Sequence, residues 1–203
     1  MILGISLKEQ GIDTCYPEEK SFWYVKAPAF SFAKLNGMDA YRSPEMKSTG
    51  EAIGYDRKFP RAMYKALIAS GVKMQNYGTV MVTLADEDKE EALPLIRRFY
   101  EMGFNIEATV GTGEFLKAHG IRTRIRRKLS ENSTEILEAI RSGYVSYVIN
   151  TRAILSGVHY EDGLAIRRTA IENNVTMFTS LDTVKVLLDV LEEITIGVSP
   201  LYA

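Results

Sequence analysis

The residues with the clearest chemical potential lie at the ends of apolar, strand-like segments. The run T-V-G-T at 109–112 follows one such segment and precedes a helical pattern, so it offers two hydroxyls, an unhindered glycine backbone and a helix amino terminus. Lys89 and Lys128 follow two further strand-like segments, and the pair Asn150 and Thr151 ends another. Hydroxyl, amide and ammonium donors in this combination are typical of a site for a phosphate or another small anion.

The elements that must position these residues begin near residue 78. From there, short segments rich in β-branched residues alternate with helical patterns of roughly 10 to 15 residues, which predicts a Rossmann-like α/β fold with a five-stranded parallel sheet and helices on both faces. The predicted strands are Thr79–Leu84, Asn105–Thr109, Arg122–Arg126, Val145–Asn150 and Val175–Phe178. The first and fourth are almost wholly apolar and should be central, whereas the third alternates basic and apolar residues and should be half-exposed.

Helices are predicted between these strands from apolar periodicity and from their capping residues. Pro94 should kink the first of them unless that helix begins after it. The predicted helices are Asp88–Met102, Thr112–His119, Thr134–Ser142, Gly163–Asn173 and Asp182–Ile194.

In a sheet of this kind, ligands bind outside the carboxyl ends of the strands, at the switch in strand order. Thr109 and Asn150 end two of the predicted strands, and Lys89 and Lys128 follow two others, so we expect the four residues to converge there. Each residue alone also has an explanation that involves no ligand. About nine in ten such lysines are simply solvated, and threonine and glycine commonly cap helices. Their arrival from four neighbouring strand ends favours an anion site.

Composition excludes several functional classes. Lys plus Arg number 25 against 26 Asp plus Glu, so no global field would attract nucleic acid or anionic lipid. The run at 122–128 is basic, but we interpret it as an exposed strand face. Cys15 is the only cysteine, and His119 and His159 are far apart, so neither a disulfide nor a zinc site is expected and both histidines are interpreted as structural. No signal peptide or transmembrane run is present, which predicts a cytoplasmic protein.

Residues 1–76 read as a separate, mostly irregular region, with the second domain at 77–203. Within it we expect a helical pattern near Ser6–Gln10, strands at Phe22–Lys26 and near Phe30–Phe32, and an amphipathic helix from about Phe59 that stops at the Ser-Gly pair 70–71.

The anion-site residues resemble those of the methylglyoxal-synthase-like domain of carbamoyl-phosphate synthetases, in which a T-x-G-T motif, two lysines and an asparagine hold the phosphate of an effector nucleotide of the UMP or IMP type. The resemblance implies a phosphate site and an apolar wall against the base and ribose. The implied phosphate ligands are Lys89, Thr109, Gly111, Thr112, Lys128, Asn150 and Thr151, and the implied wall residues are Leu129, Ile136 and Ile166.

A second resemblance concerns the first region. Asp39 and the run P-E-M-K-S-T-G-E at 44–51 resemble the exit of the second ATP-grasp module of the same large subunit, with Arg42 and Ser43 at positions where Leu and Gly are usual. The family's E-x-N-P-R segment is expected upstream of residue 1. The resemblance therefore implies a carboxy-terminal part of the synthase that is not catalytic alone. Its ATP, Mg or Mn and potassium would belong to the complete enzyme, and its partners would be the rest of the large subunit and the glutaminase small subunit.

Three functions follow as alternatives. The first is allosteric regulation of a carbamoyl-phosphate synthase in pyrimidine or arginine biosynthesis; ornithine control is not expected, since Ala27 stands where responsive members carry an acidic residue. The second is a methylglyoxal synthase acting on dihydroxyacetone phosphate. Ser133 stands in place of the catalytic aspartate of those enzymes, and Glu131, which is close in sequence, is the carboxylate that would substitute for it. The third is a fragment with an idle pocket that self-associates as a homodimer through exposed apolar surface. The loop at 151–160, longer than in the family, would frame the effector.

Overall fold

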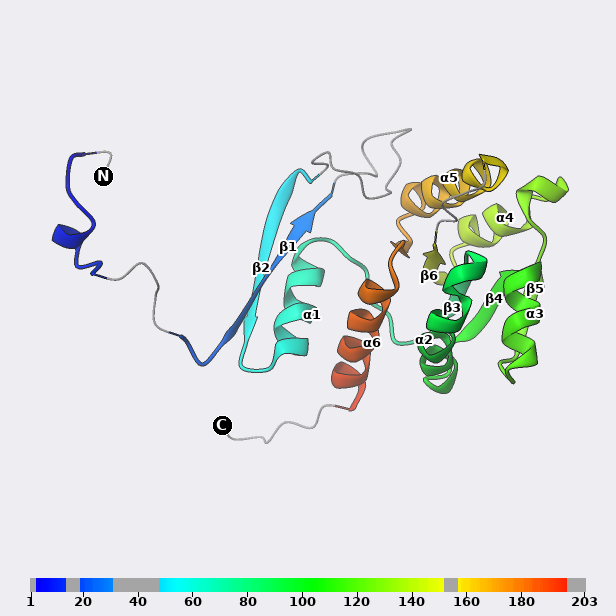
Figure 1. Ribbon diagram of the computed structural model, residues 1–203, viewed down its shortest axis with the longest axis horizontal. Coiled ribbons are helices and arrows are strands. Elements are labelled where there is room, and N and C mark those ends of the chain that lie inside the picture. Colours follow the sequence, from blue (N-terminus) through cyan, green and yellow to red (C-terminus); the bar gives the residue numbers. More distant parts are fainter. Residues whose placement is uncertain (1–2, 14–18, 31–47, 152–156, 197–203) are drawn as a thin grey trace.

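The computed structural model describes residues 3–13, 19–30, 48–151 and 157–196 of the 203-residue chain (Figure 1). Cys15, Asp39, the run at 44–47 and residues 152–156 of the loop at 151–160 lie outside these ranges, so the expectations placed on them stay predictions.

A five-stranded parallel sheet forms the centre of the larger part, with strand order β5-β4-β3-β6-β7. This confirms the predicted α/β fold, and the ends of β3, β5 and β7 each differ from the prediction by a single residue. The apolar strands β3 and β6 are central and buried throughout, as predicted, and the basic strand β5 lies at an edge. The strands are β3 (Thr79–Thr83), β4 (Asn105–Thr109), β5 (Thr123–Arg126), β6 (Val145–Asn150) and β7 (Thr176–Phe178).

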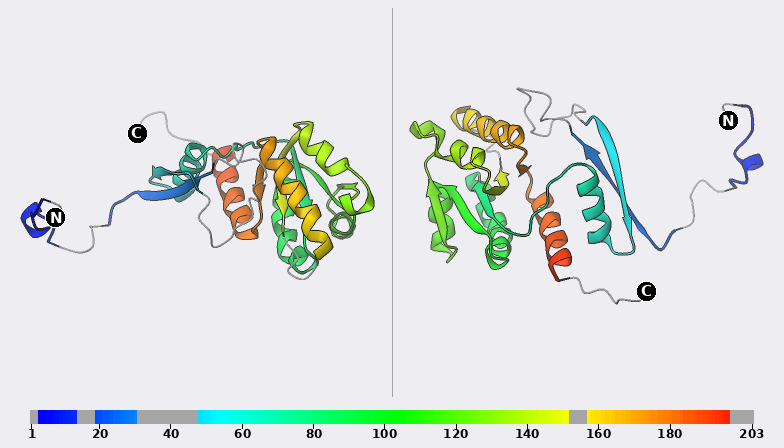
Figure 2. Two further views of the ribbon diagram at one scale, coloured as in Figure 1. Left: turned by 90° about the horizontal axis from the view of Figure 1, so that it is seen from above. Right: turned by 180° about the vertical axis from the view of Figure 1, so that it is seen from behind.

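Helices cover both faces of the sheet, as predicted. One apolar cluster joins α2, α3 and α6 to residues such as Val80 and Ile149, and a second joins α4 and α5 to Met81 and Val148 (Figures 1 and 2). Successive residues of β3 thus enter opposite clusters, because side chains alternate across a strand. The helices are α2 (Lys89–Glu101), α3 (Val110–Ala118), α4 (Glu135–Arg141), α5 (Gly157–Glu172) and α6 (Leu181–Ile196).

Two helix boundaries correct the sequence prediction. Helix α5 begins at Gly157 and not at the predicted Gly163, which lies inside the helix. Helix α2 begins at Lys89 and contains Pro94, so the alternative of a helix that begins after the proline is wrong. Proline at that position lacks the N–H that would bond to the carbonyl of Glu90.

The first region holds a two-stranded antiparallel sheet and one helix. Strand β1 (Trp23–Ala29) pairs with β2 (Gly50–Asp56), and helix α1 (Phe59–Ala69) covers one face of the pair (Figure 1). Strand β2 was not predicted, and Phe30, in the expected second strand, is not in a strand. The helical pattern near Ser6–Gln10 is a short 3-10 turn, η1 (Lys8–Gln10), whereas α1 stops before Gly71 as predicted.

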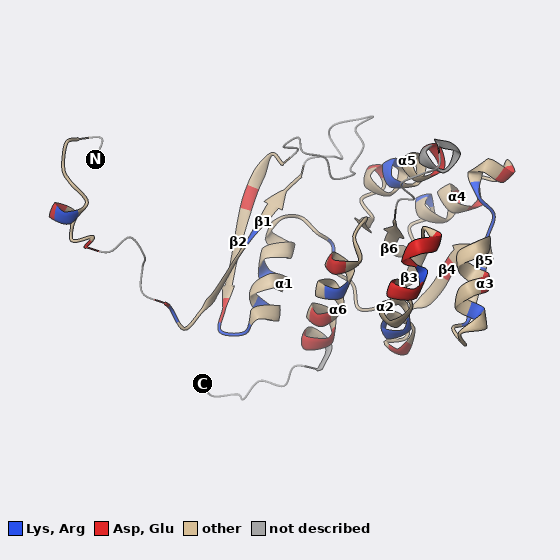
Figure 3. Ribbon diagram, in the orientation of Figure 1, with Lys and Arg blue, Asp and Glu red and all other residues tan. Residues whose placement is uncertain are grey.

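Helix α6 connects this β1–β2–α1 unit to the five-stranded domain. On one side its Glu193 accepts hydrogen bonds from Lys58 at 3.0 Å and Arg61 at 3.2 Å, next to the start of α1. On the other side Glu192 accepts from Arg98 of α2 at 2.8 Å. Basic residues on α1 and acidic residues on α6 are visible in Figure 3. The two parts of the molecule therefore share one helix as their connection.

Candidate anion-binding site

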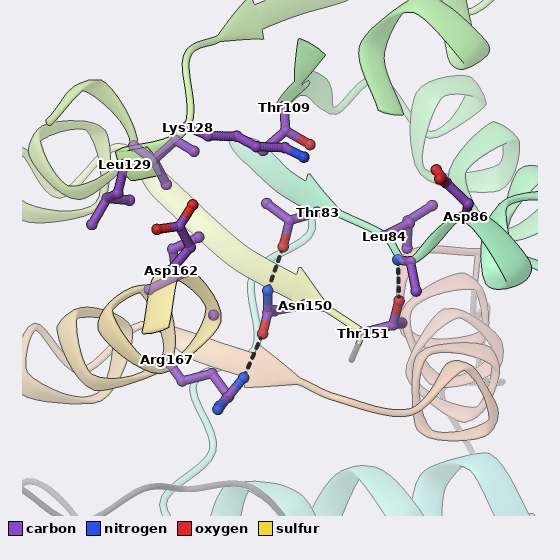
Figure 4. A pocket seen from close by; sticks show the side chains of 14 residues that line it. Thr83, Leu84, Asp86, Thr109, Lys128, Leu129, Asn150, Thr151, Asp162 and Arg167 are labelled. Atoms are coloured by element: carbon purple, nitrogen blue, oxygen red, sulfur yellow. Dashed lines mark hydrogen bonds between the residues drawn. The ribbon is translucent and has the colours of Figure 1, made fainter. Parts of the chain in front are cut away.

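A pocket opens at the carboxyl ends of the sheet strands, where the chain order reverses between β3 and β6 (Figure 4). Its volume is about 140 Å³, roughly ten times what one water needs, so it has room for a small ligand. The described residues that line it are Thr83, Leu84, Ala85, Asp86, Thr109, Lys128, Leu129, Ile136, Asn150, Thr151, Asp162, Gly163, Ile166 and Arg167.

Most of the residues implicated by the sequence meet at this pocket. Lys128, from the loop after β5, extends toward Thr109 at the end of β4 (Figure 4). Asn150 and Thr151 arrive from β6 on the other side. The three expected wall residues, Leu129, Ile136 and Ile166, also line the pocket. The cavity thus has a polar part at the strand ends and an apolar part from η4 (Leu129–Glu131), α4 and α5.

Lys89 and Gly111 lie outside the lining but next to it. The Lys89 ammonium is 2.6 Å from Oδ1 of Asp86, a residue that lines the pocket. A Cβ placed on Gly111 would be 3.6 Å from the same ammonium, so the lysine lies against the amino terminus of α3. Lys89 is therefore held in an ion pair beside the pocket.

Thr112 is buried, and its hydroxyl oxygen is hydrogen-bonded within the protein. Its Oγ1 accepts a hydrogen bond from the backbone N–H of Leu84 at 3.3 Å and another from the Thr109 hydroxyl at 3.3 Å. These bonds fasten the start of α3 to the end of β3. In this structure Thr112 positions Thr109 and does not itself line the cavity.

Thr151 orders the rim of the pocket. Its backbone N–H donates to the carbonyl of Thr83 at 3.1 Å, and its Oγ1 accepts from the backbone N–H of Ala85 at 2.9 Å (Figure 4). The hydroxyl that accepts this bond keeps its own hydrogen for another partner.

Four lining residues with polar or charged side chains were not predicted from the sequence: Thr83, Asp86, Asp162 and Arg167. Thr83 ends β3 directly opposite Asn150 in the strand register, so the predicted strand ends could have indicated it. Arg167 is a charged residue inside a helix and is 2% exposed, which no sequence pattern revealed. Asp162 accepts a hydrogen bond at Oδ2 from the backbone N–H of Ser130 at 3.1 Å.

The described residues that line the pocket include two cationic and two anionic side chains, so their formal charges cancel. Lys128 and Arg167 are cationic, whereas Asp86 and Asp162 are anionic. Preference for an anion must then come from where each group lies. Asp86 is already neutralised by Lys89, and the amino terminus of α3 adds partial positive charge beside Thr109.

The basic run around β5 does not form one free patch. Arg126 donates to Glu107 at 2.7 Å and to the Tyr144 hydroxyl at 2.8 Å, which leaves its side chain largely buried. The carboxylate of Glu107 raises the pKa of the Arg126 guanidinium. Arg127 pairs with Glu135 at 2.8 Å, and the guanidinium of Arg127 lowers the pKa of that carboxyl.

The residues considered as a catalytic base lie outside the lining. Ser133 Oγ accepts a bond from the N–H of Glu135 at 3.4 Å, and Glu131 accepts one from the N–H of Lys128 at 3.3 Å. Among the described residues no group of three or more His, Cys, Asp or Glu side chains is placed to hold a metal ion. The described helices also include none with the length and apolar character that a membrane crossing requires.

The order of the strands defines a doubly wound α/β domain, and the pocket lies at its strand ends, at the switch point where ligands bind in such sheets. In a comparison with protein families, residues 91–179 of this domain match the family model described as "MGS-like domain". Residues 91–179 are therefore similar to an MGS-like domain. A solved structure titled "Crystal structure of ForH" is 18% identical, with 58% of this chain and 80% of that chain covered and a TM-score of 0.45.

Proposed function

We propose that the chain is a regulatory part of a carbamoyl-phosphate synthase large subunit that binds a nucleotide effector of the UMP or IMP type by its phosphate. The observation that carries this proposal is the division of the pocket. Lys128, Thr109 and Asn150 supply donors from three strand ends, whereas Leu129 and Ile166 form an apolar side. A nucleotide has the same two parts, an anionic phosphate and a flat base.

Coupling to a neighbouring module would run through α6. This helix packs on the sheet by residues such as Leu188 and binds the start of α1 through Glu193. A ligand changes a distant module only if it binds two conformations with different affinity, typically by ~1 to 3 kcal/mol. A shift of α6 on the sheet would move the β1–β2–α1 unit with it.

A thermal-shift titration with UMP, IMP, inorganic phosphate and ornithine tests the proposal. A ligand at a hundred times its dissociation constant stabilises by ~2.7 kcal/mol, which for a protein of this size raises Tm by roughly 5 to 10 °C. We expect UMP or IMP to exceed phosphate clearly and ornithine to have no effect. An unchanged Tm with both nucleotides and phosphate would overturn the proposal.

We also consider a second function because two carboxylates line the pocket, and Asp162 is the one that is not paired with Lys89. Asp162 could act as the base that a methylglyoxal synthase needs to remove a proton beside a carbonyl of dihydroxyacetone phosphate. Incubation with that substrate distinguishes the two functions. Methylglyoxal formed above background, and lost in Asp162→Asn, would favour the enzyme; none formed would favour the regulatory module.

A further inference from the structure

Three buried side chains form a hydrogen-bonded line across the floor of the pocket. The Arg167 Nη1 donates to Oδ1 of Asn150 at 2.9 Å, and the Asn150 Nδ2 donates to Oγ1 of Thr83 at 2.5 Å (Figure 4). The residues come from α5, β6 and β3, and each is at most 7% exposed. The line thus joins a helix to the two central strands at the strand-order switch.

The chemistry of Arg167 fixes the direction of both bonds. A guanidinium can only donate, so the amide atom of Asn150 that faces it must be the oxygen. The amide nitrogen then faces Thr83, whose hydroxyl must accept. A hydroxyl that accepts retains its own hydrogen. The Thr83 oxygen lies 3.5 Å from the carbonyl of Ile149, the outer limit of a hydrogen bond, so its hydrogen is free to turn toward a ligand.

The backbone of α5 supports this arrangement. A Cβ placed on Gly163 would lie 2.9 Å from Nη1 of Arg167 and 3.4 Å from Oδ1 of Asn150. Any larger residue at 163 would therefore push on both members of the first hydrogen bond. Glycine inside a helix costs ~1 kcal/mol relative to alanine, and the space required by the guanidinium gives it a reason here.

We infer that Arg167 is a positioning residue that turns the Asn150 amide and the Thr83 hydroxyl so that the pocket floor offers hydrogen-bond donors to its ligand. Such a floor favours groups that only accept hydrogen bonds, such as the terminal oxygens of a phosphate ester, over hydroxyl or amino groups. The inference rests on the proposed function, because it concerns the selectivity of the same pocket. It predicts that Arg167 acts on the ligand through Thr83.

A double-mutant cycle tests this dependence, with dissociation constants for UMP measured by calorimetry in the wild-type chain, Arg167→Met, Thr83→Val and the double variant. We expect each single change to weaken binding by roughly tenfold, and the double variant to be little weaker than either. The cycle separates the two routes because effects that act through one shared contact are not additive. Losses that multiply to about a hundredfold would overturn the inference.

Two conservative variants keep the test independent of folding. Arg167→Lys retains a group that only donates, so we expect affinity within about threefold of wild type. Arg167→Gln carries an amide that can also accept, which lets Asn150 turn over, so we expect a loss close to that of Arg167→Met. Equal affinities of the Lys and Gln variants for UMP would contradict the inference. This comparison tests the inference even if Arg167→Met does not fold.

The outcomes separate this inference from the proposed function. If the wild-type chain binds UMP and the affinity losses of Arg167→Met and Thr83→Val multiply in the double variant, the nucleotide site stands but Arg167 does not act through Thr83. Absence of UMP binding by the wild-type chain would overturn both.

Discussion

The five-stranded domain and the β1–β2–α1 unit bury their strands in different ways. Strand β3 is covered by helices on both faces and is buried along its whole length. In the described part of the chain, β1 and β2 are covered by α1 on one face only. On their other face Tyr24, Ile53 and Tyr55 are each more than half exposed. A sheet with two covered faces holds its strand ends rigidly, so a precise ligand site is expected on the first and not on the second.

The largest expected difference between the two parts is in the free energy of unfolding that an isoleucine-to-alanine substitution removes from each. Ile149→Ala in β6 removes a fully buried side chain and should lower the free energy of unfolding by about 2 to 5 kcal/mol. Ile53→Ala in β2 removes a side chain that is 66% exposed and should change it by at most about 0.5 kcal/mol. Urea unfolding followed by circular dichroism measures both. A comparable loss in the Ile53 variant would show that a partner covers the open face.

A glycine substitution tests how closely β2 approaches α1. A Cβ on Gly54 would lie 2.2 Å from the carbonyl oxygen of Ala62, so Gly54→Ala should force the strand off the helix at a cost of about 1 to 3 kcal/mol. Trp23, the only tryptophan, has its ring 5.4 Å from that of Phe59 on α1 and reports this contact by its fluorescence.

Gly50→Ala is the matched control for that variant, since a Cβ at Gly50 would meet only the Ala29 side chain at 3.8 Å. Its tryptophan emission should stay at the wild-type wavelength. If Gly54→Ala also leaves the emission unchanged, the close packing of β2 on α1 is wrong.

The segment between the two parts is anchored to the domain by a tyrosine. The Tyr147 hydroxyl donates to the carbonyl of Gln75 and accepts from its N–H, each at 2.7 Å, and burial raises the pKa of Tyr147 to about 12. Tyr147→Phe should lower the free energy of unfolding by about 1 kcal/mol. Hydrogen exchange of the Gln75 amide should quicken more than that of β4. Unaltered exchange at Gln75 would argue against this anchor.

The smallest expected effect is an acid response of the β1–β2–α1 unit. Lys58 lowers the pKa of Glu193, and Lys65 lowers that of Asp56. A lowered folded-state pKa means that the stabilisation is complete above the ordinary value, near 4.5 and 3.8 respectively, and is lost as the pH falls through the folded values. Both carboxylates are still partly accessible to solvent, so the effect should be small and should weaken with salt.

Acid titration therefore should change Trp23 fluorescence at a higher pH than it changes the circular dichroism of the five-stranded domain. The double variant Asp56→Asn, Glu193→Gln should remove the early step. Simultaneous transitions in the wild-type chain would mean that the two parts unfold as one cooperative unit.

The sequence predicted the domain far better than the first region, for physical reasons. Strands such as β3 and β6 are runs of β-branched residues buried on both faces, and their local pattern suffices. Strand β2 contains Gly50 and Gly54, which disfavour strands, and it forms because α1 packs on it. Its existence therefore depends on a tertiary contact that no local pattern records.

The residues of the candidate site also fall into two groups, those that the local sequence pattern predicts and those that depend on tertiary contacts. Thr109, Lys128 and Asn150 could be predicted because each lies at the end of a strand or just after one, and parallel strands end at the same edge of a sheet. Arg167 could not be predicted, because a buried guanidinium in a helix depends on tertiary contacts such as the hydrogen bond to the Asn150 amide and the space at Gly163. Lys89 was expected at the anion and instead pairs with Asp86 in this structure.

Calorimetric titration of UMP into the wild-type chain, Lys128→Ala and Lys117→Ala tests the central claim most directly. Lys128 lines the pocket, whereas Lys117 is an exposed lysine on α3 away from it and serves as the matched control. We expect the wild-type and Lys117→Ala chains to bind UMP alike, and Lys128→Ala to bind at least tenfold more weakly with its fold intact. Equal affinity of Lys128→Ala and the wild type would contradict the assignment of this pocket as a nucleotide site.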